Sequence, residues 1–199
     1  MLKKFFHYVP LPWILVFLLI AIFFSFSFSP NPDQAKVINE DTSGFPQFYM
    51  KNVLAREYDE TGALRYQLST PAISHFQLNL NTPGPDDYTL LEKPSMIFRQ
   101  AGEAPWTIES NQGRSDNNGE LIILTDKVLI EQNSDEQGLV QVRTETLLAR
   151  PKQQFVETDK AVKITAEHTQ IDAIGMSADL ATSRLQLNTR VDAVYEPHE

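Results

Sequence analysis

The chain of 199 residues has room for one domain of moderate size, and its formal net charge of −9 argues against a nucleic-acid partner. All Asp and Glu residues, and all but two Lys and Arg residues, follow residue 29, so the later part of the chain carries the acidity. That acidity also disfavours adhesion to an anionic membrane surface. With no cysteine in the sequence, disulfides, a thiol nucleophile and a lipid-modified cysteine are excluded.

An apolar stretch without a charged residue extends over residues 11–28. At about 1.5 Å per residue, a helix here would reach roughly 27 Å, close to a hydrocarbon core of about 30 Å. Lys3 and Lys4 precede the stretch, and no further Lys or Arg occurs before Lys36. The positive-inside rule therefore predicts residues 1–10 in the cytoplasm, one membrane-spanning helix, and export of the rest.

A cleaved signal peptide is the alternative, because it would share the positive start and the apolar run. However, Ser25-Phe26-Ser27 and Ser27-Phe28-Ser29 are poor cleavage sites, and the run is longer than such peptides usually have. We therefore favour an uncleaved anchor. Residues 29–46 contain proline, glycine and polar residues with little apolar periodicity, which indicates a linker.

From residue 47 onward the pattern is that of short β-strands. Phe48–Tyr58 and Ala63–Ser69 flank the turn sequence Asp59-Glu60-Thr61-Gly62 and predict a hairpin. In the second arm, apolar side chains recur at every second position, as in a half-buried strand.

Strand character continues over residues 72–76 and is predicted to continue over 77–80. A loop with Pro-Gly-Pro and paired aspartates then follows at 81–88. Ser95–Arg99 is the next extended run, and Asn118-Gly119 is a strong hairpin-turn sequence.

A loosely repeated unit begins at Trp106. In each copy an early aliphatic residue is followed 20 positions later by Val, at Ile108 and Val128, Val142 and Val162, and Ile171 and Val191. Polar triplets occupy matching places, at Thr125-Asp126-Lys127, Thr158-Asp159-Lys160 and Asn188-Thr189-Arg190. The common spacing predicts stacked strand pairs, and the triplets predict a bulge or tight bend within them.

Together these patterns predict an all-β domain over residues 47–195 with strands stacked along one long axis, followed by a tail at 196–199. The terminal strands of such a domain carry unpaired backbone N–H and C=O groups. Another protein's strand could therefore pair with either end.

The sequence offers little for catalysis or metal binding. His7, His75, His168 and His198 lack the spacing of a metal pair, so structural or exposed roles are favoured. Ser74-His75 lacks a Gly-x-Ser-x-Gly elbow, and Asp116-Asn117-Asn118-Gly119 lacks the alternate spacing of a calcium loop. We therefore predict no catalytic residue, no metal site and no cofactor.

The order of these parts resembles the LptC family, the bitopic inner-membrane components of lipopolysaccharide transport. The resemblance covers essentially the whole chain and is sharpest in the hairpin YDETGALRYQL at 58–68 and around Gly175-Met176 in the closing segment 175–195. The Phe-rich anchor and the segment NTPGPDDYTLLEKP at 81–94 depart from the family pattern.

This resemblance implies an elongated antiparallel β-jellyroll, LptA-like, in the periplasm behind a single transmembrane helix in the inner membrane. It implies no enzyme activity. The domain is expected to accept lipopolysaccharide from an ATP-driven extractor made of LptB, LptF and LptG, and to pass it to the periplasmic protein LptA.

Alternation along the strands places a set of side chains on the inward face as candidate lipid-binding groove residues. They are Met50, Leu54, Tyr66, Leu68, Trp106, Ile108, Ile122, Leu124, Val128 and Ile130. For each of them, a place in a sealed core is the alternative to lipid contact.

The family pattern puts the extractor at the N-terminal strand, here Met50, Lys51, Asn52, Val53, Leu54 and Ala55. It puts LptA at the last strand, here Leu185, Leu187, Arg190, Val191, Ala193 and Tyr195, with Arg190 outward. A membrane-anchored β-structured adaptor that binds only proteins remains an alternative. A secreted carbohydrate-active enzyme, which would need a pair of carboxylates, is a third.

Overall fold

The computed structural model describes residues 45–79, 81–116, 118–135 and 138–195, which belong to the unit Thr42–Glu199. Among these residues, no helix has the length and apolar character that crossing a membrane requires. The predicted anchor at 11–28, most of the linker at 29–46 and the tail at 196–199 lie outside the described residues.

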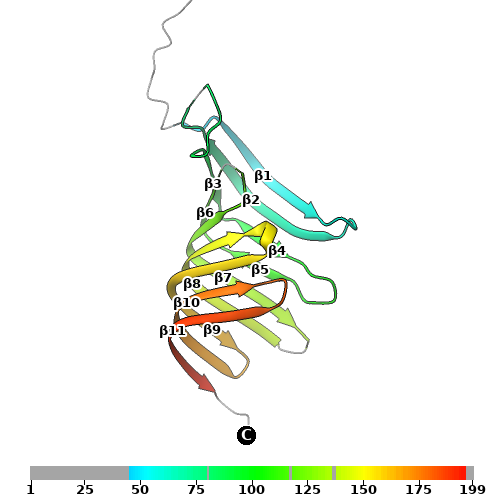
Figure 1. Cartoon of the computed structure of the whole chain (residues 1–199), viewed down its shortest axis with the longest axis vertical. Helices are drawn as coiled ribbons and strands as arrows, with labels where there is room; N and C mark the ends of the chain where they lie inside the picture. Colours follow the sequence, from blue (N-terminus) through cyan, green and yellow to red (C-terminus); the bar gives the residue numbers. More distant parts are fainter. Residues whose placement is uncertain (1–44, 80, 117, 136–137, 196–199) are drawn as a thin grey trace, which may run out of the picture. The chain divides into compact units, whose positions relative to one another are not determined.

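The described residues form one antiparallel β-sheet that folds over on itself (Figure 1). Its strands are β1 Phe48–Tyr58, β2 Leu64–Phe76, β3 Tyr88–Glu92, β4 Ser95–Phe98, β5 Trp106–Glu109, β6 Gln112–Asp116, β7 Ile122–Ser134, β8 Gly138–Arg150, β9 Phe155–Ala166, β10 Thr169–Asp179 and β11 Arg184–Tyr195. One 3-10 turn, η2 Pro151–Gln153, interrupts them. The all-β, antiparallel prediction and the 48–58/63–69 hairpin are thus confirmed.

The long strands bend near their middles, so each contributes to two layers. The first half of β2 pairs with β4 and the second half with β3, while β7 pairs with β6 and then with β5. The backbone N–H of Lys93 donates to the carbonyl of Asn111 at 2.9 Å, which joins the β3–β4 connection to the β5–β6 connection. β3 with β4, and β5 with β6, therefore each take the place of one bent strand. Counted in this way, the bent strands follow one another in chain order from β1 to β11.

We call the layer that contains β4 and β5 layer one, and the layer that contains β3 and β6 layer two. In Figure 1 the bends lie on the left and many of the loops that join strand ends lie on the right. The large side chains that are fully buried point into the space between the layers, and they include Met96, Ile108, Leu124, Ile130, Leu147 and Met176. Burial of such apolar side chains is worth about 1.5–3 kcal/mol each, so this core holds the layers together.

Polar triplets form the bends, as their sequence predicted. The β7–β8 register shifts between Thr125 and Val128, where Asp126 and Lys127 have φ angles of 63° and 58°. Arg190 has φ 52° at the corresponding place in β11. Non-glycine residues rarely adopt such angles, so the bends carry a local backbone cost.

The strand predicted over residues 77–80 is wrong for 77–79, because β2 ends at Phe76. The cause is the buried carboxylate of Asp87, which accepts the N–H of Leu78 at 2.9 Å and the N–H of Gly84 at 2.8 Å. These bonds turn the chain into a loop directly after β2. They also lower the pKa of Asp87, because they stabilise its charged form.

Substituting Gly175 tests the importance of the bends. Gly175 has φ 77°, and a Cβ there would lie 2.5 Å from Asn188 Nδ2. Gly175→Ala should cost about 1–2 kcal/mol for the left-handed backbone and about 1–3 kcal/mol more for the overlap, measured by denaturant unfolding. Gly62→Ala is the control, since Gly62 has φ 84° with nothing within 4 Å. Equal losses for the two variants would contradict the proposed crowding at the bend.

Replacing Asp87 by Asn should release the 77–87 loop and speed amide hydrogen exchange at Leu78 and Gly84. The contribution of Asp87 is complete above its ordinary pKa of 3.8, and it is lost as the pH falls through the lowered folded-state pKa. The unsubstituted chain should therefore lose the same protection in strong acid. Exposed Asp86 gives the control Asp86→Asn, which should leave exchange unchanged. Equal protection in both variants would contradict this role.

Candidate functional site

The space between the two layers is the place where the fold gathers the predicted groove residues. Tyr66, Ile108, Ile122, Leu124, Val128 and Ile130 are buried in one apolar cluster. Leu68 and Trp106 are partly buried and pack against it. The structure therefore brings these eight together, as a continuous packed interior.

Met50 and Leu54 lie apart from this cluster, with side chains 46% and 50% exposed. Met50 pairs with Ile73, which packs against the core, so Met50 lies on the inward side of β1. Leu54 pairs with Ser69, the neighbour of inward-facing Leu68, and so faces outward. The inward placement of Leu54 is wrong because the bend at Asn52, with φ 51°, shifts the alternation of side chains along β1.

Sequence reasoning missed other interior residues. Met96 and Phe98 are 0% and 2% exposed and line the same space from β4. Their signal was the apolar run Met96-Ile97-Phe98 within Ser95–Arg99, which does not by itself show which side chains face inward.

An inward row of aromatic side chains crosses layer one near its loops. Tyr66 pairs with Phe98, Phe98 with Trp106 and Trp106 with Gln132 on successive strands. The Tyr66 and Phe98 ring centroids are 5.1 Å apart. Gln132 is the last residue of the row, and its Nε2 donates to the carbonyl of Ala104 at 2.9 Å.

Two buried donors in this row have no hydrogen-bond partner among the described residues, the phenol O–H of Tyr66 and the indole N–H of Trp106. Burial raises the pKa of Tyr66 well above its ordinary value, and the nearby Glu57 carboxylate raises it further. The phenol therefore stays protonated and can donate. A buried donor without a partner costs about 1–3 kcal/mol, so this row is energetically incomplete.

The two ends of the sheet have free edges. β1 pairs only with β2, and β11 pairs only with β10, among the described residues. Large apolar side chains are exposed on both, at Phe48, Tyr49, Met50 and Leu54 in β1 and at Leu185, Val191, Val194 and Tyr195 in β11. In β11, Leu185, Leu187, Val191 and Ala193 share the inward face, by their pairing with β10. Each end can therefore extend the sheet and its apolar inner face.

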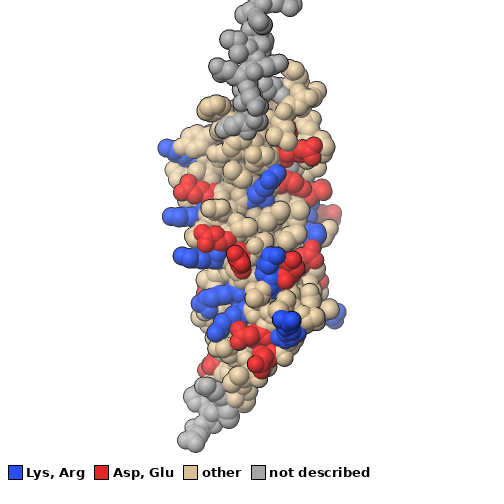
Figure 2. Space-filling model, turned by 90° about the vertical axis from the view of Figure 1, so that its left-hand side faces the viewer, with Lys and Arg blue, Asp and Glu red and all other residues tan. Residues whose placement is uncertain are grey.

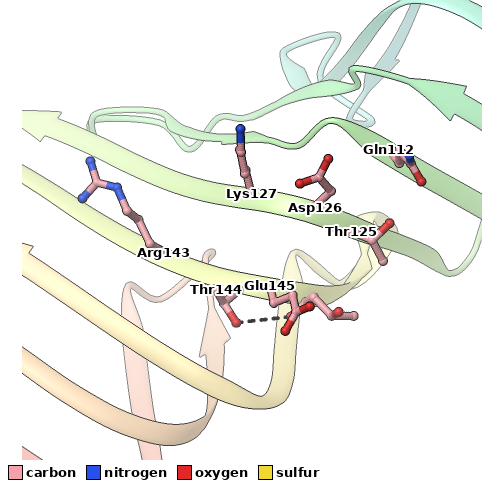
Figure 3. A pocket seen from close by; sticks show the side chains of 8 residues that line it. Gln112, Thr125, Asp126, Lys127, Arg143, Thr144 and Glu145 are labelled. Carbon is pink, nitrogen blue, oxygen red and sulfur yellow. Dashed lines mark hydrogen bonds between the residues drawn. The ribbon is translucent and has the colours of Figure 1, made fainter.

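The outer surface carries polar hollows instead. One of about 770 Å³ lies at the β7 and β8 bends and is lined by Gln112, Thr125, Asp126, Lys127, Arg143, Thr144, Glu145 and Thr146 (Figure 3). On the face shown in Figure 2, Lys and Arg side chains are interspersed with Asp and Glu. Such mixed charge suits contact with water and does not suit acyl chains.

His75 has structural contacts in the described part of the chain. His75 stacks on Phe48 with ring centroids 4.7 Å apart, and its Nδ1 lies 3.0 Å from Thr89 Oγ1. No group of three or more potential metal ligands is found within residues 45–195, apart from the undescribed positions there. His7 and His198 lie outside the described residues.

The chain is thus a two-layer β-protein with an apolar interior and two open edges. The family model described as "Lipopolysaccharide-assembly, LptC-related" matches residues 13–196. The chain belongs to this LptC family. It is therefore a non-enzymatic component of lipopolysaccharide transport, with a periplasmic domain associated with the cell envelope.

A comparison with curated protein sequences finds no match. Among solved structures, the chain is similar to LptH, described as the LptA homologous periplasmic component of the conserved lipopolysaccharide transport device from Pseudomonas aeruginosa. The identity is 13% and the TM-score 0.47, over 66% of this chain and 95% of that chain.

Proposed function

We propose that the chain accepts lipopolysaccharide from the inner-membrane extractor of LptB, LptF and LptG. The acyl chains enter the space between the two layers, and the lipid then passes to LptA. The two-layer architecture supports this role, because an apolar interior can shelter acyl chains while polar sugars stay in water. The apolar, unpaired edges of β1 and β11 suit partners that continue the sheet on either side.

The proposal includes the position of each part of the chain. Residues 1–10 lie in the cytoplasm, and residues 11–28 cross the inner membrane. The linker at 29–46 leads to the periplasmic domain at 47–195. The tail at 196–199 follows this domain. The extractor meets β1 near Met50–Ala55. LptA meets β11 at the edge near Leu185–Tyr195.

The observation that carries the lipid role is the pair of buried donors on Tyr66 and Trp106 that lack a partner among the described residues. An acyl chain enters with an ester or amide carbonyl at its head, and that oxygen accepts hydrogen bonds. Both donors lie in one inward row, separated by Phe98. A bound lipid would satisfy donors that the protein alone leaves unpaired.

An adaptor that binds only proteins is the second candidate. The observation in its favour is the packing of the interior, in which Met96, Ile108 and Leu124 are each 0% exposed. An interior that stays this tightly packed has no room for an acyl chain.

Removing the Tyr66 hydroxyl separates these functions. Tyr66→Phe should raise the free energy of unfolding by about 1 kcal/mol, because it removes a buried donor without a partner. The same change should weaken capture of purified lipopolysaccharide by about 3- to 10-fold, because the bound lipid loses a hydrogen bond. Denaturant unfolding and equilibrium binding measure the two effects.

Tyr58→Phe is the matched control, since the Tyr58 side chain is 55% exposed. It should change neither stability nor capture. If Tyr66→Phe binds lipopolysaccharide as tightly as the unsubstituted chain, the donor role is wrong. If the unsubstituted chain captures no lipopolysaccharide, the lipid role is wrong and the adaptor function is favoured.

A further inference from the structure

The two layers meet again on the side opposite the bends, through three hydrogen bonds between side chains and loops. Arg65 Nη2 donates to the carbonyl of Lys152 at 3.1 Å. Gln154 Nε2 donates to the carbonyl of Arg99 at 3.4 Å.

The third contact joins residues far apart in the sequence. Ser183 Oγ donates to Glu103 Oε2 at 2.8 Å. Arg65, Arg99 and Glu103 belong to the loop ends of layer one. Lys152, Gln154 and Ser183 belong to the loops that join β8 to β9 and β10 to β11 in layer two. We call these three contacts the seam bonds.

Buried residues accompany the seam bonds and close the interior behind them. Pro151 is buried, and Gln154 and Leu180 are 6% and 4% exposed. The Leu180 N–H donates to the Gln154 carbonyl at 2.8 Å, which ties the two loops of layer two to each other. Leu180 belongs to the same apolar cluster as Tyr66 and Phe98. The seam therefore lies over the end of the interior where the two donors without partners are found.

The two sides of the β-structure differ in what holds the layers together. On the bend side, covalent chain passes from one layer to the other in strand after strand. On the seam side, no covalent link joins the layers within the described residues, and Glu103, Ser183 and Lys152 are exposed to water. The Arg65–Lys152 and Ser183–Glu103 bonds are exposed, and such bonds contribute little net stability because water competes for them. The bond from Gln154 is partly buried. On the seam side the layers are therefore held by the apolar core and by these three bonds. Separation there would use the bends as the hinge, and acyl chains would replace the apolar contacts that the two layers make with each other.

We propose that the seam bonds form a releasable latch over the lipid entrance, and that lipid enters when the latch opens. This inference rests on the proposed function and adds the device that regulates access to the interior. It accounts for the packed interior, because the structure holds the latched state. It also gives residues of the β8–β9 and β10–β11 loops a role that their sequence did not indicate.

A covalent lock across the seam tests the latch. The chain has no cysteine, so Glu103→Cys with Ser183→Cys introduces a single pair that a short thiol-reactive crosslinker can join. Crosslinking the purified full chain should reduce the rate of capture of purified lipopolysaccharide at least about 10-fold. With a bis-methanethiosulfonate as the crosslinker, both links are disulfides, and their cleavage by added dithiothreitol should restore the rate.

Asn133→Cys with Leu139→Cys is the matched control, because these exposed residues face each other on β7 and β8 within layer one. Its crosslink spans no seam and should leave capture unchanged. Equal capture by the locked and unlocked Glu103→Cys/Ser183→Cys chain would overturn the latch while leaving the proposed function intact. If the unlocked chain also fails to capture lipopolysaccharide, and the unsubstituted chain fails too, both proposals are wrong.

Removing one seam bond gives the opposite change. Ser183→Ala should capture and release lipopolysaccharide about 2- to 10-fold faster, as expected from the loss of one hydrogen bond. The equilibrium affinity should change less than the rates, because Ser183 lies outside the interior. An unchanged or slower rate would contradict the latch.

Discussion

The need for every strand to bend at the same level is the constraint on which the rest of the structure depends. Paired antiparallel strands share their hydrogen bonds, so one strand can turn from layer one to layer two only where its neighbours also turn. Asp126, Lys127 and Arg190 adopt left-handed backbone angles at this level, and Gly175 does so where Asn188 leaves no room for a Cβ. The bends in turn bring two apolar faces together without closing the opposite side by covalent chain. They therefore create an interior that is fixed at one side and separable at the other.

The proposed transport of lipid needs an apolar interior, two sheet edges that pair with neighbouring proteins, and an entrance for the lipid. The aromatic row with Tyr66 and Trp106 gives the interior its polar end, and the unpaired edges of β1 and β11 allow neighbours to extend it. Under the proposed function, opening of the seam bonds would convert the packed core of the empty protein into an interior that holds lipid.

The sequence predicted antiparallel strands, the first hairpin and the bends, because side-chain alternation and turn residues are local signals. It also predicted the inward position of residues such as Ile108 and Val128. It failed at Leu54. There β1 and β2 bend together, which changes the side of the sheet that successive side chains face but leaves the pairing of the two strands unchanged. It also failed after Phe76, where the Asp87 carboxylate accepts a hydrogen bond from the backbone N–H of Leu78, nine residues earlier in the chain. The contact of Glu103 with Ser183 lies beyond any local signal, because only the folded sheet brings these loops together.

The most direct test of a lipid-carrying interior is site-specific photocrosslinking in intact cells from two neighbouring positions on β2. Leu68 faces the interior, whereas Gln67 faces outward and accepts a hydrogen bond from Arg56 Nε at 3.3 Å. We predict an adduct with lipopolysaccharide from a photoreactive residue at position 68 and none from position 67. Failure to obtain this adduct from position 68, or equal yields from both positions, would contradict the account.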